Sequence, residues 1–346
     1  MHNVGIIGAG PGTWALHLPT LGALPADFRV VHLADLGGGR AEQLARRDGV
    51  RFSADAADVL ADPDVEVVAI CTPPASHAEL ILAAVRAGKR AVFCEKPIAT
   101  TSAELDAVVE ACTGAGVTLV VGTNHLFDPA WGHVKHHLNA ASARVLSVSA
   151  TLSLAPNGRY HEAVSDPVPA LSPPDRPPVD PADRALSAAI VRQLVLGLAI
   201  HDLPLVRDVA PVFEEISFAR ALPPIGYDIG FRASGALVRL TALINASGAD
   251  SLWRVRIATT HDRVDVDFPP PFVHAGSAAV RVRDEEGRIL RFPVEPSDGY
   301  LEEWRALAAL LRGDLPMEFE ELEADARFAI ILADAVADAI RDGGAA

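Results

Sequence analysis

The sequence lacks the features of a disulfide-stabilised protein and of a nucleic-acid-binding one. Its 346 residues include only three cysteines, an odd number that forms no disulfide framework and indicates a reducing, cytoplasmic location. The 30 basic residues are outnumbered by 45 acidic ones, which gives a formal net charge of −15. Because duplex nucleic acid and anionic membranes attract a positive protein face, neither is predicted as a partner.

Long apolar runs and targeting signals are also missing. The N-terminus has no basic segment followed by a long apolar run, so no signal peptide is predicted. The most apolar internal stretch, Ala185–Ile200, is interrupted by Arg192 and Gln193 and is shorter than the ~20 residues of a membrane span. We therefore expect this stretch to be a core helix.

The first third of the chain alternates between two periodicities. Short apolar runs, typical of buried parallel strands, are separated by stretches with helical period, as in βαβ units. Ser76 and Glu79 have the spacing of a helix capping box. The pattern predicts a doubly wound α/β Rossmann domain over residues 1–125. Its predicted strands are Val4–Gly8, Phe28–Leu33, Val65–Cys71, Ala91–Cys94 and Val117–Val121.

The pattern changes after residue 125. A predicted helix, Pro129–Asn139, and a predicted strand, Arg144–Leu154, lead to an irregular Pro-rich insert over residues 155–183. Ala185–Val209 is predicted to be helical, and four alternating runs before residue 294 predict a mostly antiparallel sheet. Two helices close the chain and can pack back on the first domain. Residues 126–346 are thus predicted to form an α+β domain with an open sheet.

A glycine-rich loop over residues 8–13 follows the first predicted strand. Gly8 permits a tight turn, and Gly10 lets the backbone approach a pyrophosphate at the N-terminus of the next helix. The third glycine of this dinucleotide fingerprint is replaced by Thr13, so the loop alone is a weak signal that a plain turn would also explain. The predicted cofactor contacts here are Gly8, Gly10, Pro11, Gly12 and Thr13.

Asp35 stands just beyond the second predicted strand, where an acid accepts hydrogen bonds from the adenosine ribose hydroxyls. A carboxylate there repels a 2′-phosphate, which favours NAD over NADP. Arg40 follows three glycines and could instead hold a 2′-phosphate, so NADP stays open as a cofactor. The structural alternative is that Asp35 caps the loop and Arg40 is solvated.

The next two strand ends carry a more specific pattern. One strand ends in Cys71–Pro73 with His77 shortly after it, the turn Ala87–Lys89 closes the next helix, and Glu95–Pro97 ends the following strand. In this order and spacing the chain resembles the glucose–fructose oxidoreductase, inositol dehydrogenase and rhizopine catabolism (Gfo/Idh/MocA) family. The resemblance implies an NAD(P)-dependent oxidoreductase with further cofactor contacts by Cys71, Thr72, Pro73, His77, Glu95 and Lys96.

Lys96 is the predicted reaction-centre residue. The carboxyl ends of strands in such sheets face the ligand crevice, so a lysine there can donate to a substrate hydroxyl or carbonyl. The resemblance implies that Lys96 orients the substrate and assists proton transfer, and that the peptide bond to Pro97 is cis. His17 also fits the family pattern, and it is predicted to be a packing residue.

The second domain departs from the family pattern around His201, the predicted acid–base residue. In the family an Asp stands four residues before the active-site His, where this chain has Gly197. The family also commonly has an Arg before the Phe of the Phe-x-Pro run, where this chain has Leu126. His201 could act alone, Lys96 could carry the proton, or Asp202 could substitute from another angle. His125 and Asp202 are the predicted substrate contacts.

The leading prediction is therefore hydride transfer at a carbinol or carbonyl carbon of a sugar, cyclitol or related polar metabolite. Two alternatives remain open: a redox-neutral enzyme with tightly held NAD, and a non-catalytic dinucleotide-binding protein. His133 and His137 share a helix face at metal-ligand spacing. Because no carboxylate or Cys at ligand spacing completes a metal-binding set, no metal is predicted. The resemblance implies a homodimer or homotetramer assembled through the C-terminal sheet.

Overall fold

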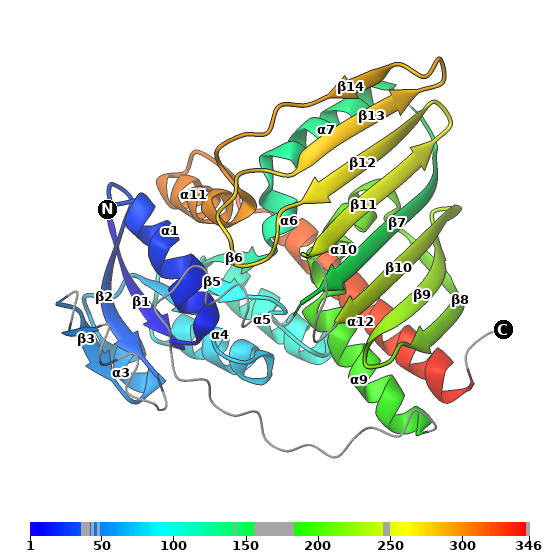
Figure 1. Ribbon diagram of the computed structural model, residues 1–346. Helices are drawn as coiled ribbons and strands as arrows, with labels where there is room; N and C mark the ends of the chain where they lie inside the picture. The colour runs from blue at the N-terminus through cyan, green and yellow to red at the C-terminus, as the bar shows by residue number, and fades with distance from the viewer. Residues whose placement is uncertain are drawn as a thin grey trace. The chain divides into compact units, whose positions relative to one another are not determined.

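The computed structural model describes residues 1–35, 42, 45–46, 49–141, 143–155, 183–244 and 250–343. Arg40 and nearly all of the Pro-rich insert lie outside these residues. The chain forms two compact units, shown in Figure 1. The first unit comprises Met1–Thr123 and Tyr300–Arg327, and the second comprises Asn124–Gly299 and Phe328–Ala346.

The first unit is built on a six-stranded parallel sheet with the order β3-β2-β1-β4-β5-β6. The order reverses between β1 and β4, and the carboxyl ends of strands at such a point form a ligand crevice. The predicted doubly wound fold is confirmed, with an additional short edge strand, β3, that has no apolar run. The strands are β1 His2–Ile7, β2 Phe28–Ala34, β3 Arg51–Ser53, β4 Val67–Ile70, β5 Ala91–Glu95 and β6 Thr118–Gly122.

Helices connect these strands, and one of them shows where a capping box forms. At the start of α5, the Thr101 hydroxyl accepts from the Glu104 N–H at 3.2 Å, and the Glu104 carboxylate accepts from the Thr101 N–H at 3.1 Å. The capping box predicted at Ser76 is wrong, because the Ser76 hydroxyl donates to the Pro73 carbonyl oxygen. The helices are α1 Leu18–Ala23, α3 Ala56–Ala61, α4 His77–Arg86, α5 Ser102–Ala115 and α11 Gly299–Arg312.

An aromatic cluster joins the late helix α11 to this sheet. The fully buried Trp304 ring stacks on Phe93 with centroids 4.5 Å apart and meets the edge of Phe28 at 5.2 Å. Such pairs add stability beyond the area that they bury. Residues from the end of the sequence therefore complete the core of the first unit.

The second unit contains an eight-stranded sheet with the order β14-β13-β12-β11-β7-β10-β9-β8. Every pairing is antiparallel except that of β7 with β10, so the predicted open, mostly antiparallel sheet is confirmed. The strands are β7 Val145–Leu154, β8 Phe213–Ala221, β9 Ile225–Ala233, β10 Ala236–Ile244, β11 Leu252–Thr259, β12 Asp262–Phe268, β13 Ala279–Asp284 and β14 Ile289–Arg291.

The two faces of this sheet differ in polarity. Alternate residues of β11, such as Val255 and Ile257, are buried. The residues that precede them, Arg254 and Arg256, point to the outer face. The helices α7 and α9 contact the sheet, and Phe328 of α12 packs near Phe231 of β9. The remaining helices are α6 Asn124–Phe127, α7 Pro129–Ala141, α9 Arg184–Gly197, α10 Leu203–Val209 and α12 Phe319–Arg341.

The single helix predicted over Ala185–Val209 is wrong. The chain forms α9, a 3-10 turn over Ala199–His201, and then α10. Pro204 lies in the first turn of α10, where its missing N–H cannot continue a helix from the preceding turn. Arg184–His201 has the length and composition of a membrane-spanning helix, but α9 contacts β8 and β9 of the sheet. The break places His201 and Asp202 at a corner between two helices.

Candidate functional site

The glycine loop has the shape needed for a dinucleotide. Gly8 has φ +99°, and a Cβ there would lie 2.6 Å from the Cys71 carbonyl oxygen, so only glycine fits. A Cβ at Gly10 or Gly12 would meet nothing within 4 Å. The loop therefore packs tightly against the end of β4 on one side and leaves open space at its two later glycines. This arrangement fits a pyrophosphate held by backbone N–H groups at the helix start.

Thr13 explains how the loop keeps its shape without the third glycine. Its hydroxyl donates to the Gly8 carbonyl oxygen at 2.7 Å, and the side chain is 1% exposed. The helical segment begins at Pro11 and has a π turn over Thr13–His17. The Thr13 side chain thus holds the loop from inside, and the cofactor contact predicted for this residue stays a prediction.

Asp35 lies directly after β2, at the same edge of the sheet as the glycine loop. Its backbone N–H donates to the Ser53 carbonyl oxygen at 3.2 Å, which fixes the strand end, and its side chain is half-buried. Arg40, the residue predicted to compete with it, lies outside the described residues. Of the two residues predicted to decide cofactor choice, Asp35 is the one that lies within the described residues, and it stands at this edge of the sheet.

His77 ties together the two loops that follow β4 and β5. The ring is fully buried, its Nε2 lies 2.7 Å from the Thr72 carbonyl oxygen, and its Nδ1 lies 2.7 Å from that of Pro97. Both nitrogens are thus occupied by backbone. The ring thereby sets the spacing of the loops that carry Thr72 and Lys96, and the cofactor contact predicted for His77 stays a prediction.

Glu95, Lys96 and Pro97 end β5, and the Lys96–Pro97 peptide bond is cis. Burial lowers the pKa of the Lys96 ammonium from its usual value, although the neighbouring Glu95 carboxylate opposes this shift. For Glu95 itself, burial would raise the pKa, but the His17 contact and the Lys96 charge hold it below its usual value. The pair therefore presents an ionised carboxylate beside a lysine whose proton is easier to remove.

His17 is hydrogen-bonded to the Glu95 carboxylate of this pair, a role that the sequence did not reveal. Its Nε2 lies 2.9 Å from Glu95 Oε1, and the Trp304 indole N–H donates to its Nδ1 at 3.3 Å. The indole contact favours the neutral ring, in which the Nε2–H donates to Glu95. We favour that tautomer, since an indole can only donate.

The second unit carries His201 at the corner between its helices. Its Nδ1 lies 2.7 Å from Asn124 Oδ1 in α6. An amide oxygen can only accept, so Nδ1 carries the hydrogen and Nε2 is the nitrogen that takes up a proton in the neutral ring. Asn124 thus fixes the tautomer of His201. The sequence did not single out Asn124, because the family pattern pointed to Leu126 and to His125 beside it.

A carboxylate–imidazole pair does exist in this unit, but it does not involve His201. Asp202 Oδ1 lies 2.9 Å from His125 Nδ1, and both Asp202 oxygens accept from the Trp253 indole N–H at 2.9–3.0 Å. His125 stacks on Phe268 with centroids 3.6 Å apart. Asp202 and His125 are both 3% exposed. Asp202 is thus hydrogen-bonded to His125 and Trp253, whereas His201 is hydrogen-bonded to Asn124. The substrate contacts predicted for His125 and Asp202 stay predictions.

The missing carboxylate at Gly197 has no steric cause. A Cβ at this position would meet nothing within 4 Å, so the backbone itself leaves room for a Cβ. The chain instead gives His201 a neutral partner, Asn124. This exchange removes the negative charge that would otherwise favour the imidazolium form of the base.

His133 and His137 each lie within hydrogen-bond distance of a carboxylate. His133 Nε2 lies 2.8 Å from Glu295 Oε1, and His137 Nε2 lies 2.7 Å from Asp262 Oδ2. Across the ranges that the structure describes, no group of three or more His, Cys, Asp or Glu side chains could hold a metal ion.

Comparison with known proteins matches the first unit to one family. Residues 2–123 match the Gfo/Idh/MocA model, an oxidoreductase family with an NAD-binding Rossmann fold. Inositol 2-dehydrogenase 2 of Saccharopolyspora erythraea is 37% identical over 166 residues, which are 47% of this chain and 48% of that protein. The oxidoreductase YrbE of Bacillus subtilis, described as uncharacterized, is 35% identical over 38% of each chain. The chain thus spans less than half the length of these two relatives.

Other similarities extend over nearly the whole chain at lower identity. An inositol 2-dehydrogenase of Rubrobacter xylanophilus is 27% identical over 98% of this chain and 91% of that protein. The structure of KijD10, a 3-ketoreductase from Actinomadura kijaniata in complex with TDP-benzene and NADP, aligns with a TM-score of 0.72 at 21% identity, covering 97% of this chain and 96% of that chain. At that identity the structural likeness shows the two-domain fold alone.

Proposed function

The chain belongs to the Gfo/Idh/MocA oxidoreductase family, and on this premise we propose that it is an NAD-dependent enzyme acting on a polar metabolite. The reaction is hydride transfer at a carbinol or carbonyl carbon of a cyclitol, a sugar or a related compound. The inositol dehydrogenases among its relatives support this substrate class. When bound, the nicotinamide supplies or accepts the hydride.

The position of Lys96 is the observation on which this proposal mainly rests. It stands at the carboxyl end of β5, one strand from the point where the strand order reverses. In reduction, its ammonium group donates to the substrate carbonyl oxygen and protonates it as hydride reaches the carbon. In oxidation, the hydroxyl proton moves to Lys96 or to Nε2 of His201. A lysine with a lowered pKa is suited to both directions, because acid–base catalysis is most efficient near the working pH.

The proposal is tested by incubating the purified protein with NAD or NADH and a panel of cyclitols, sugars and keto-sugars. We expect substrate-dependent appearance or loss of absorbance at the reduced-nicotinamide band. No turnover across the panel despite tight NADH binding would instead support a non-catalytic dinucleotide-binding protein.

A redox-neutral reaction with tightly held NAD is the second candidate, and Gly197 favours it. Without the family carboxylate beside His201, the usual acid–base pair for simple alcohol oxidation is changed. The absorbance spectrum and the mass of any nucleotide released from freshly purified protein separate the two. Co-purified, non-exchanging NAD with turnover but no net absorbance change would favour the redox-neutral reaction.

Cofactor choice gives a direct prediction for Asp35. The carboxylate accepts from the adenosine ribose hydroxyls and repels a 2′-phosphate, so the unmodified chain should bind NADH more tightly than NADPH. Asp35→Ser should reduce that preference by about tenfold or more, the size expected for one hydrogen bond to a charged group. Fluorescence titration measures both dissociation constants.

The matched control for Asp35 is Asp58→Ser, which removes an exposed carboxylate from α3 in the same unit. It should leave the preference unchanged. Equal affinity of the unmodified chain for NADH and NADPH would contradict the role of Asp35.

We also propose a homodimer or homotetramer assembled through the outer face of the C-terminal sheet, in a reducing cytoplasm. Two exposed leucines on that face, Leu237 at 55% and Leu252 at 38%, support such a contact, and the free thiols of Cys71, Cys94 and Cys112 are consistent with that compartment. Sedimentation equilibrium measures the assembly, and a monomeric mass would contradict it.

A further inference from the structure

A buried chain of hydrogen bonds leads from α11 to the end of β5 in the first unit. The Trp304 indole N–H donates to His17 Nδ1 at 3.3 Å, and His17 Nε2 lies 2.9 Å from Glu95 Oε1. Trp304 is 0% exposed and His17 is 1% exposed, so bulk water does not compete for these hydrogen bonds. Glu95 directly precedes Lys96. The chain of hydrogen bonds therefore ends beside the residue that is proposed to exchange a proton with the substrate.

The His17 ring can donate in one direction only. Its Nδ1 accepts from the indole, so the hydrogen of the neutral ring is on Nε2 and faces the carboxylate. The ring also makes edge contacts with Phe93 and Trp304, with centroids 5.1 and 6.2 Å apart. A change of tautomer would break both hydrogen bonds. His17 is thus a fixed donor to Glu95.

The Glu95 carboxylate is confined on another side by β6. Gly122 is the register partner of Glu95, and a Cβ on Gly122 would lie 3.4 Å from Glu95 Oε2. The carboxylate therefore lies directly against backbone, with no side chain between the two strands at this point. The fold thus holds the negative charge of Glu95 between the His17 ring and the end of β6.

Lys96 depends on this carboxylate for its own charge. Burial lowers the pKa of the Lys96 ammonium, and Glu95 is the group that opposes this shift. The other titratable groups that interact with His17 and Glu95 are the Cys71 thiol and the His77 ring. Both nitrogens of His77 face backbone carbonyl oxygens, so its ring is engaged elsewhere. Glu95 is therefore the link between His17 and Lys96.

We propose that His17 is a positioning residue for Lys96, because its hydrogen bond keeps the Glu95 carboxylate ionised and in place beside the ammonium. The carboxylate in turn keeps Lys96 protonated until the proton moves to the substrate. Without the His17 N–H, burial would favour the neutral form of Glu95, and Lys96 would lose its proton more readily. The inference rests on the proposed function, in which Lys96 is the acid.

The protonation of Lys96 can be followed without turnover. Acetic anhydride acetylates only the neutral amine, so the labelling rate of Lys96 against pH, read by mass spectrometry of its peptide, reports the pKa of this group. In His17→Leu the labelling midpoint should fall by about half a pH unit, which is about threefold in rate. In His17→Gln the amide N–H can still donate to Glu95, and the midpoint should return toward that of the unmodified chain.

A double variant separates an effect on charge from a loss of packing. Glu95→Gln should lower the Lys96 midpoint by about one pH unit. Adding His17→Leu to Glu95→Gln should lower it no further, because His17 acts through the carboxylate. In reduction Lys96 must be protonated, so activity falls as pH rises through its pKa. The alkaline limb of kcat/KM should therefore move to lower pH in His17→Leu, by the same amount as the labelling midpoint.

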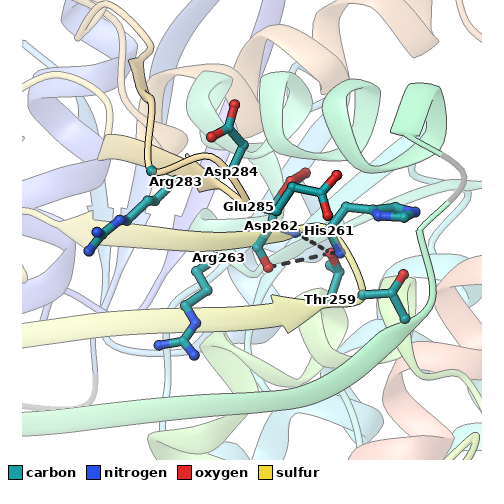
Figure 2. Close-up of a pocket in the computed structure, with 9 residues that line it drawn as sticks. Thr259, His261, Asp262, Arg263, Arg283, Asp284 and Glu285 are labelled. Carbon is teal, nitrogen blue, oxygen red and sulfur yellow. Dashed lines mark hydrogen bonds between the residues drawn. The ribbon is translucent and has the colours of Figure 1, made fainter.

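His137→Leu is the matched control. His137 Nε2 lies 2.7 Å from Asp262 Oδ2 in the second unit. Figure 2 shows Asp262 beside Thr259, whose hydroxyl accepts from the Asp262 N–H at 2.9 Å. The variant thus removes a similar imidazole–carboxylate contact from another part of the chain, and it should change neither the labelling midpoint nor the pH profile.

An unchanged Lys96 midpoint in folded His17→Leu would overturn the inference, and so would a further shift in the double variant. A lowered midpoint with an unmoved pH profile would support the inference and contradict Lys96 as the acid, which distinguishes failure of the proposed function. Should His17→Leu fail to fold, His17→Phe replaces it, because it keeps an aromatic ring against Phe93 and Trp304 but has no N–H to donate.

Discussion

Replacing Lys96 with Met is expected to lower kcat/KM with the metabolite substrate by about 10²–10⁴-fold, the usual contribution of a positioned acid–base group. Methionine keeps the length and apolar stem of the side chain but cannot donate a proton. Since the glycine loop and Asp35 are untouched, the dissociation constant for NADH should change little. Steady-state kinetics and fluorescence titration on the same preparation measure the two quantities.

The sequence offers a natural control, because it contains only three lysines. Lys135→Met removes the same charge from α7, where Lys135 pairs with Asp208 at 3.4 Å, and it should retain full activity. Lys89 is unsuitable, since its ammonium is buried and donates to the Asp62 and Val65 carbonyl oxygens. Full activity of Lys96→Met would remove Lys96 from the reaction centre.

Exchanging Asn124 for Asp is expected to move the pH profile of substrate oxidation. A carboxylate 2.7 Å from His201 Nδ1 stabilises the imidazolium, and such a neighbour raises the pKa of a histidine by about one unit or more. The base is active when neutral, so activity rises as pH increases through that pKa. The acid limb of kcat/KM should therefore shift upward by about one pH unit.

Nuclear magnetic resonance titration of the His201 ring separates two possible failures of this prediction. If the pKa of His201 rises but the pH profile of kcat/KM does not move, Asn124 positions the ring and His201 is not the base. If the pKa of His201 does not rise, the pairing with Asn124 is itself contradicted. Asn139→Asp makes the same change at an exposed position of α7 and should shift neither quantity.

The first unit was largely predictable because its signals are local. A fully buried parallel strand needs a short apolar run, and a tight turn before a phosphate-binding helix needs glycine at Gly8. Lys96 at a strand end follows from the same logic, since all strands of a parallel sheet end at one edge. The short strand β3 was missed because an exposed edge strand of three residues carries no apolar pattern.

The partners of the functional side chains were not predictable. His17 receives a hydrogen bond from Trp304, 287 residues away, and Asn124 and Asp202 each bond a histidine 77 residues away. The sequence left open that Asp202 substitutes, from another angle, for the carboxylate missing at Gly197. At the corner formed before Pro204, however, Asp202 bonds His125 and Trp253 while His201 bonds Asn124.

The sequence by itself determined the class of each unit, the glycine turn, and the placement of Asp35 and Lys96 at strand ends, because periodicity and backbone sterics act over a few residues. Only the tertiary structure decided which carboxylate or amide orients each histidine and that Thr13 and His77 serve as internal supports. It likewise joined Trp304 and His17 to the carboxylate of Glu95. Hydrogen-bond pairing depends on distances between elements far apart in the chain, and no local pattern encodes those distances.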